Sequence, residues 1–199
     1  MSEHSREITP DDILPLEDYA KVRAERRRQI IELKRDRRLA VGPDATFYFE
    51  SYATMLQQVQ EMVWTEKGGA AQIADELAAY NPLVPKGDEL VATVMFEIDD
   101  EDRRLRILTG LGGVEETMVI EVGEARIVGR PETGDHVERT AADGKTSSIH
   151  FMHFRFQADQ IARFRDPGVR VVVAIEHENY AHMAVLPEAV RHALSEDFD

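Results

Sequence analysis

Aromatic and histidine residues are most concentrated at Ser147-Ser148-Ile149-His150-Phe151-Met152-His153-Phe154-Arg155-Phe156. The side chains of this segment alternate as they do on the two faces of a β-strand. One face carries His150, Met152, Phe154 and Phe156, and the other carries Ile149, Phe151 and His153. Because a strand that is apolar on both faces is usually covered on both, we predict a central strand of a buried sheet at residues 147–156.

Residues 1–80 have a mainly helical pattern. Thr9, Pro10 and the two aspartates that follow are typical of a helix start. Beyond Pro15, the spacing of apolar residues predicts a long helix and, after two short strands, two further helices. The predicted helices span residues 17–37, 52–66 and 70–80, and the predicted strands span residues 39–41 and 46–49.

Residues 81–88 contain two prolines and form the clearest linker in the chain. Beyond this linker the pattern predicts strands at residues 89–98, 117–122, 125–128, 169–177 and 182–186, and short helices at residues 99–108, 159–165 and 187–194. The polar residues 131–145, which include His136, predict an exposed loop. We therefore predict a single α+β domain over residues 1–199, with a mainly helical part (1–80) packed on a mainly antiparallel sheet (81–199).

The composition is that of a folded, soluble protein, since 43% of the 199 residues are hydrophobic and 31% are charged. No apolar run approaches the roughly 20 residues that span a bilayer, and the N-terminus has no hydrophobic signal core. We therefore expect a cytoplasmic protein that does not enter a membrane. The chain has no cysteine, which excludes disulfides, thiolate catalysis and metal sites that depend on its own sulfur.

Charge is distributed unevenly along the chain. The formal net charge is −14, but residues 21–38 contain nine basic and three acidic residues, so the remainder carries −20. This basic segment is either a surface for nucleic acid or an acidic partner, or a solvated helix face docked partly on the chain's own acidic body. It has no interleaved aromatic residues and no DNA-binding motif, and the whole molecule is acidic. We therefore expect a protein partner or an internal role rather than nucleic acid.

Two common kinds of site are disfavoured by residue spacing. Di-iron sites in helical bundles use Glu-x-x-His pairs, and none occurs on the predicted helices at 52–66 and 70–80. The glycine-rich segments at residues 109–113 and 129–134 lack the dinucleotide-binding and P-loop patterns. No Gly-x-Ser-x-Gly motif is present either, so no catalytic residue is assigned and the question of enzymatic activity stays open.

Three histidines in apolar surroundings are candidate metal ligands: His150, His177 and His182. If Asn179-Tyr180 forms a two-residue turn, His177 and His182 lie directly opposite each other, with Cβ atoms about 5 Å apart. Two imidazoles at that distance can bind one divalent ion, and His150 or a nearby carboxylate, such as Glu176 or Glu178, would complete the site. The alternative is that these histidines are satisfied by backbone and tyrosine hydrogen bonds.

A small-ligand site is the related possibility. We predict that it is formed by His150 and His177, with Tyr180 either orienting the ligand or anchoring the turn after His177. His153 is an odd number of residues from His150, so the two rings point to opposite faces of the predicted strand and cannot regularly share one metal ion.

Several segments together resemble a bacterial family called domain of unknown function 3501. The similarity covers nearly the whole chain and is carried by residues 8–16, 37–43, 60–62, 75–77, 80–85, 90–93, 145–151 and 177–180. His150 and His177 match residues of the family's motifs, whereas His153 and His182 do not. Trp64 stands where an arginine is usual, and Glu178-Asn179 stands where the family has His-Pro-type residues, which weakens the prediction of a paired-histidine metal site.

The resemblance implies little about chemistry, because the family has no assigned activity. Its genes often lie beside those of rubrerythrin-like and iron–sulfur oxidoreductase proteins, which implies an accessory role in redox or peroxide defence. We therefore carry two functional hypotheses. The first is a non-catalytic partner of a redox protein, and the second is a metal- or small-ligand-binding protein or enzyme centred on His150 and His177.

Overall fold

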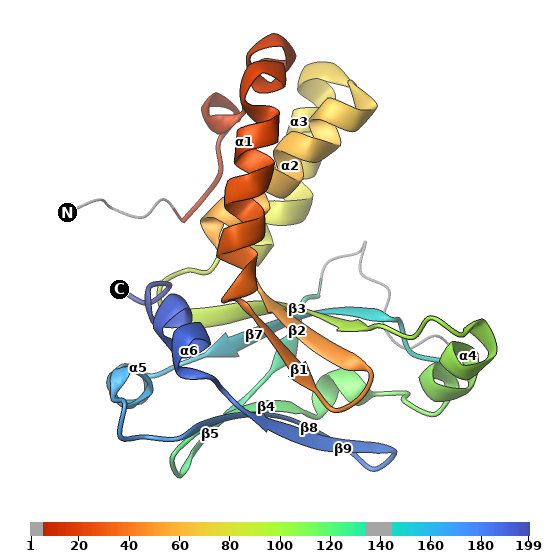
Figure 1. The fold of residues 1–199 in the computed structure, drawn as a ribbon, viewed down its shortest axis with the longest axis vertical. Helices are drawn as coiled ribbons and strands as arrows, with labels where there is room; N and C mark the ends of the chain where they lie inside the picture. The colour runs from red at the N-terminus through yellow and green to blue at the C-terminus, as the bar shows by residue number, and fades with distance from the viewer. Residues whose placement is uncertain (1–5, 134–144) are drawn as a thin grey trace.

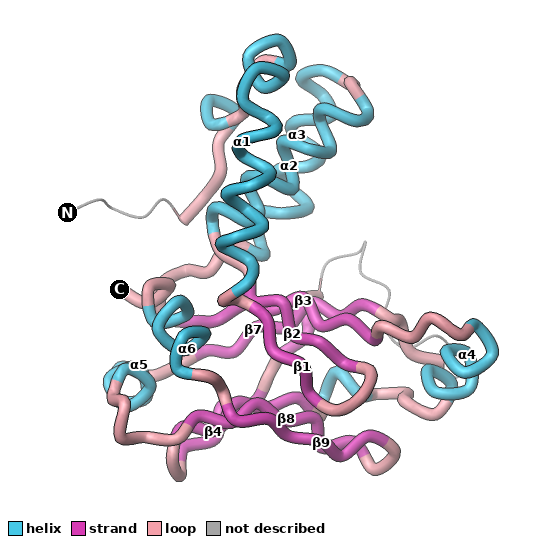
Figure 2. Tube along the Cα trace, in the orientation of Figure 1, coloured by secondary structure: helices cyan, strands magenta, loops and turns pink. Residues whose placement is uncertain are grey.

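The computed structural model describes residues 6–133 and 145–199. Three helices form an arm that projects from a β-body of two sheets (Figures 1 and 2). The helical arm consists of α1 (Leu16–Arg35), α2 (Tyr52–Glu66) and α3 (Gly69–Tyr80). The predicted α+β class is confirmed, and the three predicted arm helices agree closely with the observed ones. None of the described helices has the length and apolar character needed to cross a membrane.

Both sheets of the β-body are antiparallel. Sheet A has the order β1-β2-β3-β7-β6 and sheet B the order β5-β4-β8-β9. Sheet A comprises β1 (Arg38–Val41), β2 (Ala45–Phe49), β3 (Glu89–Phe96), β6 (Arg130–Pro131) and β7 (Ile149–Arg155). Sheet B comprises β4 (Met118–Val122), β5 (Ala125–Val128), β8 (Val171–His177) and β9 (Tyr180–Val185). The prediction of one sheet formed by residues 81–199 is wrong, because β1 and β2 complete sheet A and the remaining strands divide between two layers.

Strand β7 has the predicted alternation of faces. His150, Met152 and Phe154 are buried in the core, whereas Ile149 on the opposite face is 38% exposed. The strand pairs with β3 along its length but with the two-residue β6 only at His153 and Met152. The prediction of a strand covered on both faces is therefore wrong at Ile149, because the helical arm covers only part of the outer face of sheet A.

The main hydrophobic core lies between the two sheets. At one end it is closed by α5 (Ala158–Arg165), α6 (Glu188–Ser195) and the C-terminal residues, and α4 (Glu101–Thr109) lies at the opposite end (Figure 1). Three phenylalanine rings form the closed end, with Phe156 centred 5.7 Å from Phe164 and 4.9 Å from Phe198. Edge-to-face contacts at these distances stabilise a core beyond the area that they bury.

A second, smaller core holds the arm together and joins it to sheet A. Met55, Val59 and Val63 of α2 pack there with Leu77 of α3, as the spacing of i, i+4 and i+8 in α2 requires. The buried Gln60 side chain ties the arm to the N-terminal segment, because it accepts a hydrogen bond from the Leu14 amide and donates one to the Leu14 carbonyl.

Two boundary differences affect the candidate site. The long helix ends at Arg35 rather than at residue 37, so that Arg38 begins β1 and the Arg37 carbonyl accepts a hydrogen bond from the Phe49 amide. The final hairpin begins its second strand at Tyr180 rather than at residue 182. The predicted loop at 131–145, with His136, falls mostly in residues 134–144, which lie outside the described residues.

Candidate functional site

His150 lies in the core of the β-body and is 2% exposed. Its Nε2 atom is 2.9 Å from the Ser147 carbonyl oxygen, to which it donates, and 3.2 Å from Thr146 Oγ1. The ring also meets Phe96 edge-on, with centroids 6.1 Å apart. Burial lowers the pKa of His150, although the Glu115 charge and the Ser147 hydrogen bond oppose the shift. These contacts hold His150 as a neutral imidazole within its own strand.

His177 lies at the other sheet, where it anchors the turn between β8 and β9. Its Nδ1 atom accepts a hydrogen bond from the Asn179 amide at 3.2 Å, and its Nε2 atom is 3.2 Å from the Gly112 carbonyl. The Asn179 side chain donates to the Gly110 carbonyl at 2.9 Å. Both ring nitrogens of His177 therefore have backbone partners, and the turn is fastened to the loop that follows α4.

Tyr180 clamps the two sheets together. Its hydroxyl donates to the Val41 carbonyl at 3.0 Å and accepts from the amides of Asp44 and Ala45, each at 2.9 Å. Burial raises the pKa of Tyr180, although the two amide hydrogen bonds oppose the shift. Since three backbone groups surround this hydroxyl, the structure favours the predicted role of turn anchor over that of ligand contact.

The predicted pairing of His177 with His182 is wrong. The two-residue turn is Glu178-Asn179, so His177 is registered with Tyr180, and His182 is registered with Ile175. Because the observed turn lies one residue earlier than the predicted one, the residue opposite His177 is Tyr180 rather than His182, two positions away. His182 instead packs on the Tyr180 ring, with centroids 4.6 Å apart.

Gly42 explains why His182 and Tyr180 fit together. This glycine has φ of +76°, and a Cβ atom placed on it would lie 2.6 Å from the His182 ring and 2.8 Å from the Tyr180 hydroxyl. Only glycine adopts this backbone conformation at low cost while leaving room for both rings.

Among residues 6–133 and 145–199, no group of three His, Cys, Asp or Glu side chains could hold a metal ion. The predicted divalent-metal ligands His150, His177 and His182 therefore form no such group.

His153 is not one of the predicted site residues, yet its ring lies between two carboxylates. Nδ1 is 3.1 Å from Glu89 Oε2, and Nε2 is 2.9 Å from Glu132 Oε2. Burial lowers the pKa of His153, but the hydrogen bond and charge of Glu89, followed by those of Glu132, outweigh it and raise the pKa overall. The strand pattern placed His153 opposite His150, but its partners are 64 and 21 residues away in sequence.

His153 lies in a cleft of about 910 Å³ at the end of sheet A formed by β6 and β7. Arg126, Arg130 and Arg155 also line the cleft. Arg126 and its ion-pair partner Glu176 both belong to sheet B, whereas Arg155 of β7 approaches Glu89 of β3 at 3.8 Å. Glu89 therefore has both His153 and Arg155 beside it, and Glu132 has His153.

We expect the two histidines of β7 to titrate in opposite directions from the ordinary histidine pKa of about 6.5. His150 should lose its proton below that value and His153 above it. The stability contributed by His153 is therefore complete below about pH 6.5 and is lost as pH rises through its folded pKa, whereas the penalty from His150 appears as pH falls below about 6.5. Imidazole ¹H–¹⁵N correlation spectra recorded across pH measure both values.

The matched control for this titration is Glu89→Gln. This variant should lower the pKa of His153 and leave that of His150 unchanged, because Glu89 contacts His153 alone of the two rings. Observation of His153 titrating at or below the pKa of His150 would contradict the assigned contacts.

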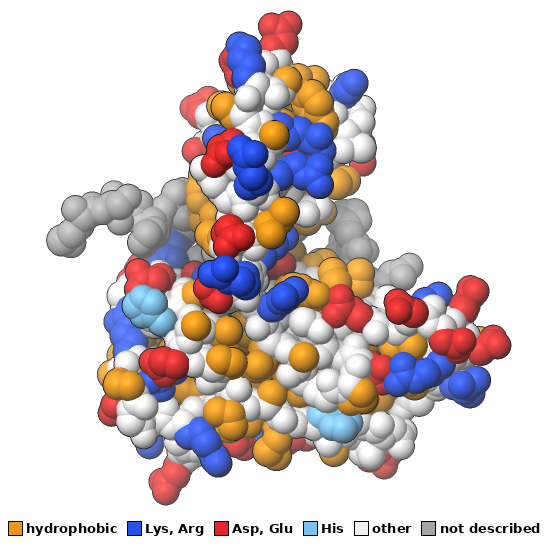
Figure 3. Space-filling view, in the orientation of Figure 1, with side chains coloured by type: hydrophobic (Ala, Val, Ile, Leu, Met, Phe, Trp, Pro, Cys, Tyr) orange, Lys and Arg blue, Asp and Glu red, His pale blue; other side chains and the backbone are white. Residues whose placement is uncertain are grey.

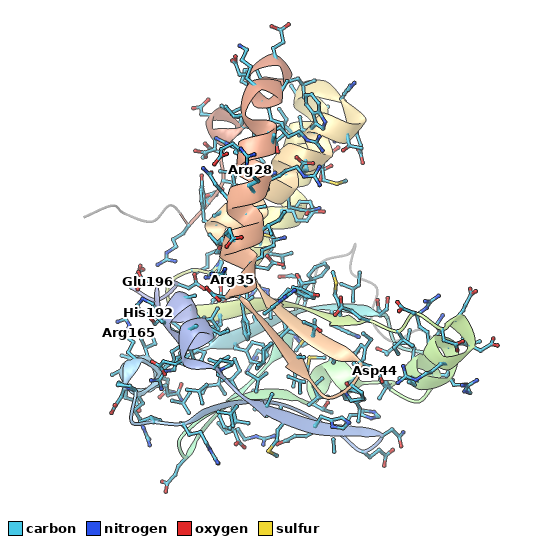
Figure 4. All side chains as sticks on the ribbon, viewed as in Figure 1. Arg28, Arg35, Asp44, Arg165, His192 and Glu196 are labelled. Atoms are coloured by element: carbon cyan, nitrogen blue, oxygen red, sulfur yellow. The ribbon has the colours of Figure 1, made fainter. Side chains whose placement is uncertain are left out.

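The remaining candidate is the basic surface of the arm. We define it by Arg27, Arg28, Ile31, Lys34 and Arg35 of α1, which share one helix face because they are spaced i, i+1, i+4, i+7 and i+8. All five are exposed, and Ile31, in the middle, is 62% exposed. Figure 3 shows Lys and Arg side chains gathered along the arm, and Figure 4 labels Arg28 and Arg35 on α1.

Most of the arm's basic residues have no strong partner in the protein. Arg28 pairs with Glu25, and Arg35 pairs with Glu32 at 2.9 Å, but these side chains are more than half exposed, and such pairs contribute little. Arg27 and Lys34 form no ion pair with any residue that the structure describes. The structure therefore leaves most of this positive charge available to a partner.

Two other basic residues of the segment have internal roles. Arg23 binds both carboxylate oxygens of Glu61 on α2, at 2.9 and 2.8 Å, and lies 5.4 Å from the centre of the Trp64 ring. Arg37 is buried in the β-body. The prediction that this segment docks partly on the chain's own acidic groups is confirmed for these two residues, and the basic surface lies outside them.

Comparison with known proteins identifies relatives over nearly the whole chain. Residues 7–198 match the family described as "Protein of unknown function (DUF3501)". The crystal structure of a novel protein of unknown function from Burkholderia pseudomallei K96243 has a TM-score of 0.87 and is 31% identical, covering 96% of this chain and 99% of that chain. No curated protein matches. The predicted family resemblance is confirmed.

Proposed function

The chain belongs to the DUF3501 family, and from that premise we propose that it is a non-catalytic partner protein that docks an acidic protein through the basic surface of its helical arm. The observation that carries this proposal is the face of α1 on which four cations surround an exposed isoleucine. A helix with 20 residues normally buries an apolar stripe, yet Tyr19 is the only residue of α1 that is buried. Most of the helix is therefore free for intermolecular contact.

The chemistry of this surface fits an acidic protein better than a nucleic acid. Protein interfaces place apolar side chains at their centre and charged ones around them, which is the arrangement of Ile31 among four cations. Charges farther away than about 8 Å are largely screened at physiological ionic strength, so these local cations outweigh the net charge of −14 at the contact. The redox proteins implied by the family resemblance, rubrerythrin-like and iron–sulfur proteins, are the partners that we propose.

The test uses purified rubrerythrin-like and iron–sulfur proteins from the same organism, with affinity measured by calorimetry. We expect one of them to bind and the double variant Arg27→Glu/Arg28→Glu to weaken binding by roughly tenfold or more, because like charges would then face each other. Raising the ionic strength should weaken wild-type binding in the same direction.

The control makes the same change of charge on the β-body. Arg163→Glu/Arg170→Glu replaces two exposed arginines away from the arm and should leave the affinity unchanged. His177→Ala should leave it unchanged as well, since that ring anchors a turn. Absence of binding by both proteins, equal loss in the control, or equally tight binding of a random DNA duplex would refute the proposal.

The second candidate function, metal or small-ligand binding at His150 and His177, has less support. Both rings have hydrogen-bond partners in their own chain, and they lie on different sheets. Elemental analysis of protein purified without an affinity tag distinguishes the two functions. Stoichiometric metal that is lost in a His150→Ala variant would support the second.

A further inference from the structure

A second cavity lies where the arm meets the outer face of sheet A. It has a volume of about 370 Å³, within the range of small-molecule sites, and is lined by residues of α2, α3, β2, β3 and β7. Its walls are mostly apolar and aromatic. They include the side chains of Tyr48, Met55, Tyr80, Ile149 and Phe151. A hydrocarbon or aromatic part of a ligand would therefore be buried against apolar side chains in this cavity.

The lining of this mostly apolar cavity includes one acidic side chain, that of Glu50. Glu50 lines the cavity and is only 6% exposed. Its Oε1 accepts a hydrogen bond from the Thr93 hydroxyl at 2.7 Å, and its Oε2 accepts one from the Thr54 hydroxyl at 2.6 Å. Neither donor is charged, and Glu50 forms no ion pair with any residue in the described part of the chain.

The nearest buried guanidinium does not supply the missing charge. Arg37 donates to the main-chain oxygen of Glu50 at 2.7 Å and forms its ion pair with Asp197. The N-terminus of α2 and the two hydroxyls stabilise a carboxylate at this position in part. A buried carboxylate without a cation is nevertheless costly, and the open space beside Glu50 is the cavity itself. Lys34 forms no ion pair with Glu50 either, so the counter-charge is expected from a ligand.

We propose that this cavity binds a small primary organic ammonium ion. The ammonium group donates to Glu50, and the hydrocarbon part of the ligand lies against the faces of Tyr80 and Phe151, since aromatic faces attract cations and bury apolar groups well. Lys34 also lines the cavity and is exposed. Its positive charge disfavours a second cationic group on the ligand, so monoamines should bind better than diamines.

The ligand series that tests this proposal uses the wild-type full-length protein. Calorimetry with hexylamine, 1-hexanol and hexanoate compares a cation, a neutral group and an anion on one hydrocarbon chain. Hexylamine should bind roughly 10- to 100-fold tighter than 1-hexanol, as a hydrogen bond to a charged group implies, and hexanoate should bind more weakly still. No binding of hexylamine, or equal affinity for hexylamine and 1-hexanol, would overturn the proposal.

Two variants test whether the preference for hexylamine over 1-hexanol depends on the Glu50 carboxylate. Glu50→Gln keeps the size of the side chain and should remove most of the preference for hexylamine over 1-hexanol while leaving 1-hexanol binding unchanged. Glu178→Gln makes the same change of charge at an exposed position in the β8–β9 turn and should have no effect. An unchanged preference in Glu50→Gln, or an equal loss in Glu178→Gln, would overturn the assignment.

The ligand series decides the question even if Glu50→Gln does not fold, because it needs no variant. Its outcome is also distinguishable from that of the docking test, since the ligand series uses no partner protein, and the docking test changes Arg27 and Arg28 but not Lys34, the residue that the cavity shares with the basic surface.

Discussion

Replacing Arg37 with alanine is expected to lower the free energy of unfolding by about 3–5 kcal/mol, the range for breaking a buried ion pair by removing one partner. Arg37 is 5% exposed and joins three segments of the chain. Its guanidinium donates to the carbonyls of Phe49 at 3.0 Å, Glu50 at 2.7 Å and Ala193 at 3.1 Å, and pairs with Asp197. The variant would leave all four acceptors without this donor, including a buried charge.

The pH dependence of this loss follows from Asp197. Burial raises the pKa of the Asp197 carboxyl, and the charge of Arg37 opposes that rise. Without Arg37 the pKa should rise further, so the folded variant binds a proton more readily than its unfolded chain does. The destabilisation measured by urea unfolding should therefore be smaller near pH 4 than near pH 7, where Asp197 is left charged.

Arg38→Ala is the matched control, since Arg38 is the next residue and is exposed. It should change stability by less than about 0.5 kcal/mol, as exposed substitutions usually do. The double variant Arg37→Met/Asp197→Leu removes both charges and should recover much of the loss. Equal losses from Arg37→Ala and Arg38→Ala would show that the buried pair has no special role.

The strand at 147–156 could be predicted from sequence because its evidence is local. Alternation of side chains within one strand fixes which residues share a face, and His150 and Ile149 lie on the predicted faces. Helix periodicity is equally local, which is why the three arm helices were predicted to within a few residues. In such segments the spacing of apolar residues is enough to predict the helix or strand.

The histidine site could not be predicted because it depended on long-range register. The pattern of residues 177–182 allowed two positions for a two-residue turn, and the choice decided the cross-strand partner of His177. His153 was missed for a related reason, since Glu89 and Glu132 are brought to it by strand pairing between distant segments. Local patterns say nothing about such partners.

Glu50 illustrates the same limit for charged residues. In the sequence it is one of 38 acidic residues and directly follows a predicted strand. Its burial results from the packing of the arm on sheet A, where Thr93 of β3 and Thr54 of α2 meet its two oxygens. The burial of a charged residue can therefore be predicted only when the positions of the helices and strands that enclose it are known.

Replacing Phe154 with alanine is expected to cost about 3–5 kcal/mol of unfolding free energy, the range for removing a large aromatic side chain from a core. Phe154 is fully buried, and its ring centre is 6.4 Å from that of Phe47. Gly129 lies so close that a Cβ atom placed on it would be 2.8 Å from the Phe154 ring. Tight packing on several sides prevents the core from collapsing into the space left by the ring, so the loss should be near the upper end of this range.

Ile149→Ala provides the comparison within the same strand. Ile149 lies on the outer face of β7 and is 38% exposed, so its truncation leaves no closed cavity and should cost less than about 1 kcal/mol. Chemical unfolding followed by circular dichroism measures both variants under the same conditions. If the two losses were equal, the two faces of β7 would not differ in burial. The assignment of Phe154, Met152 and His150 to the space between the sheets would then be wrong, because only the inner face of a sandwich strand is enclosed by both layers.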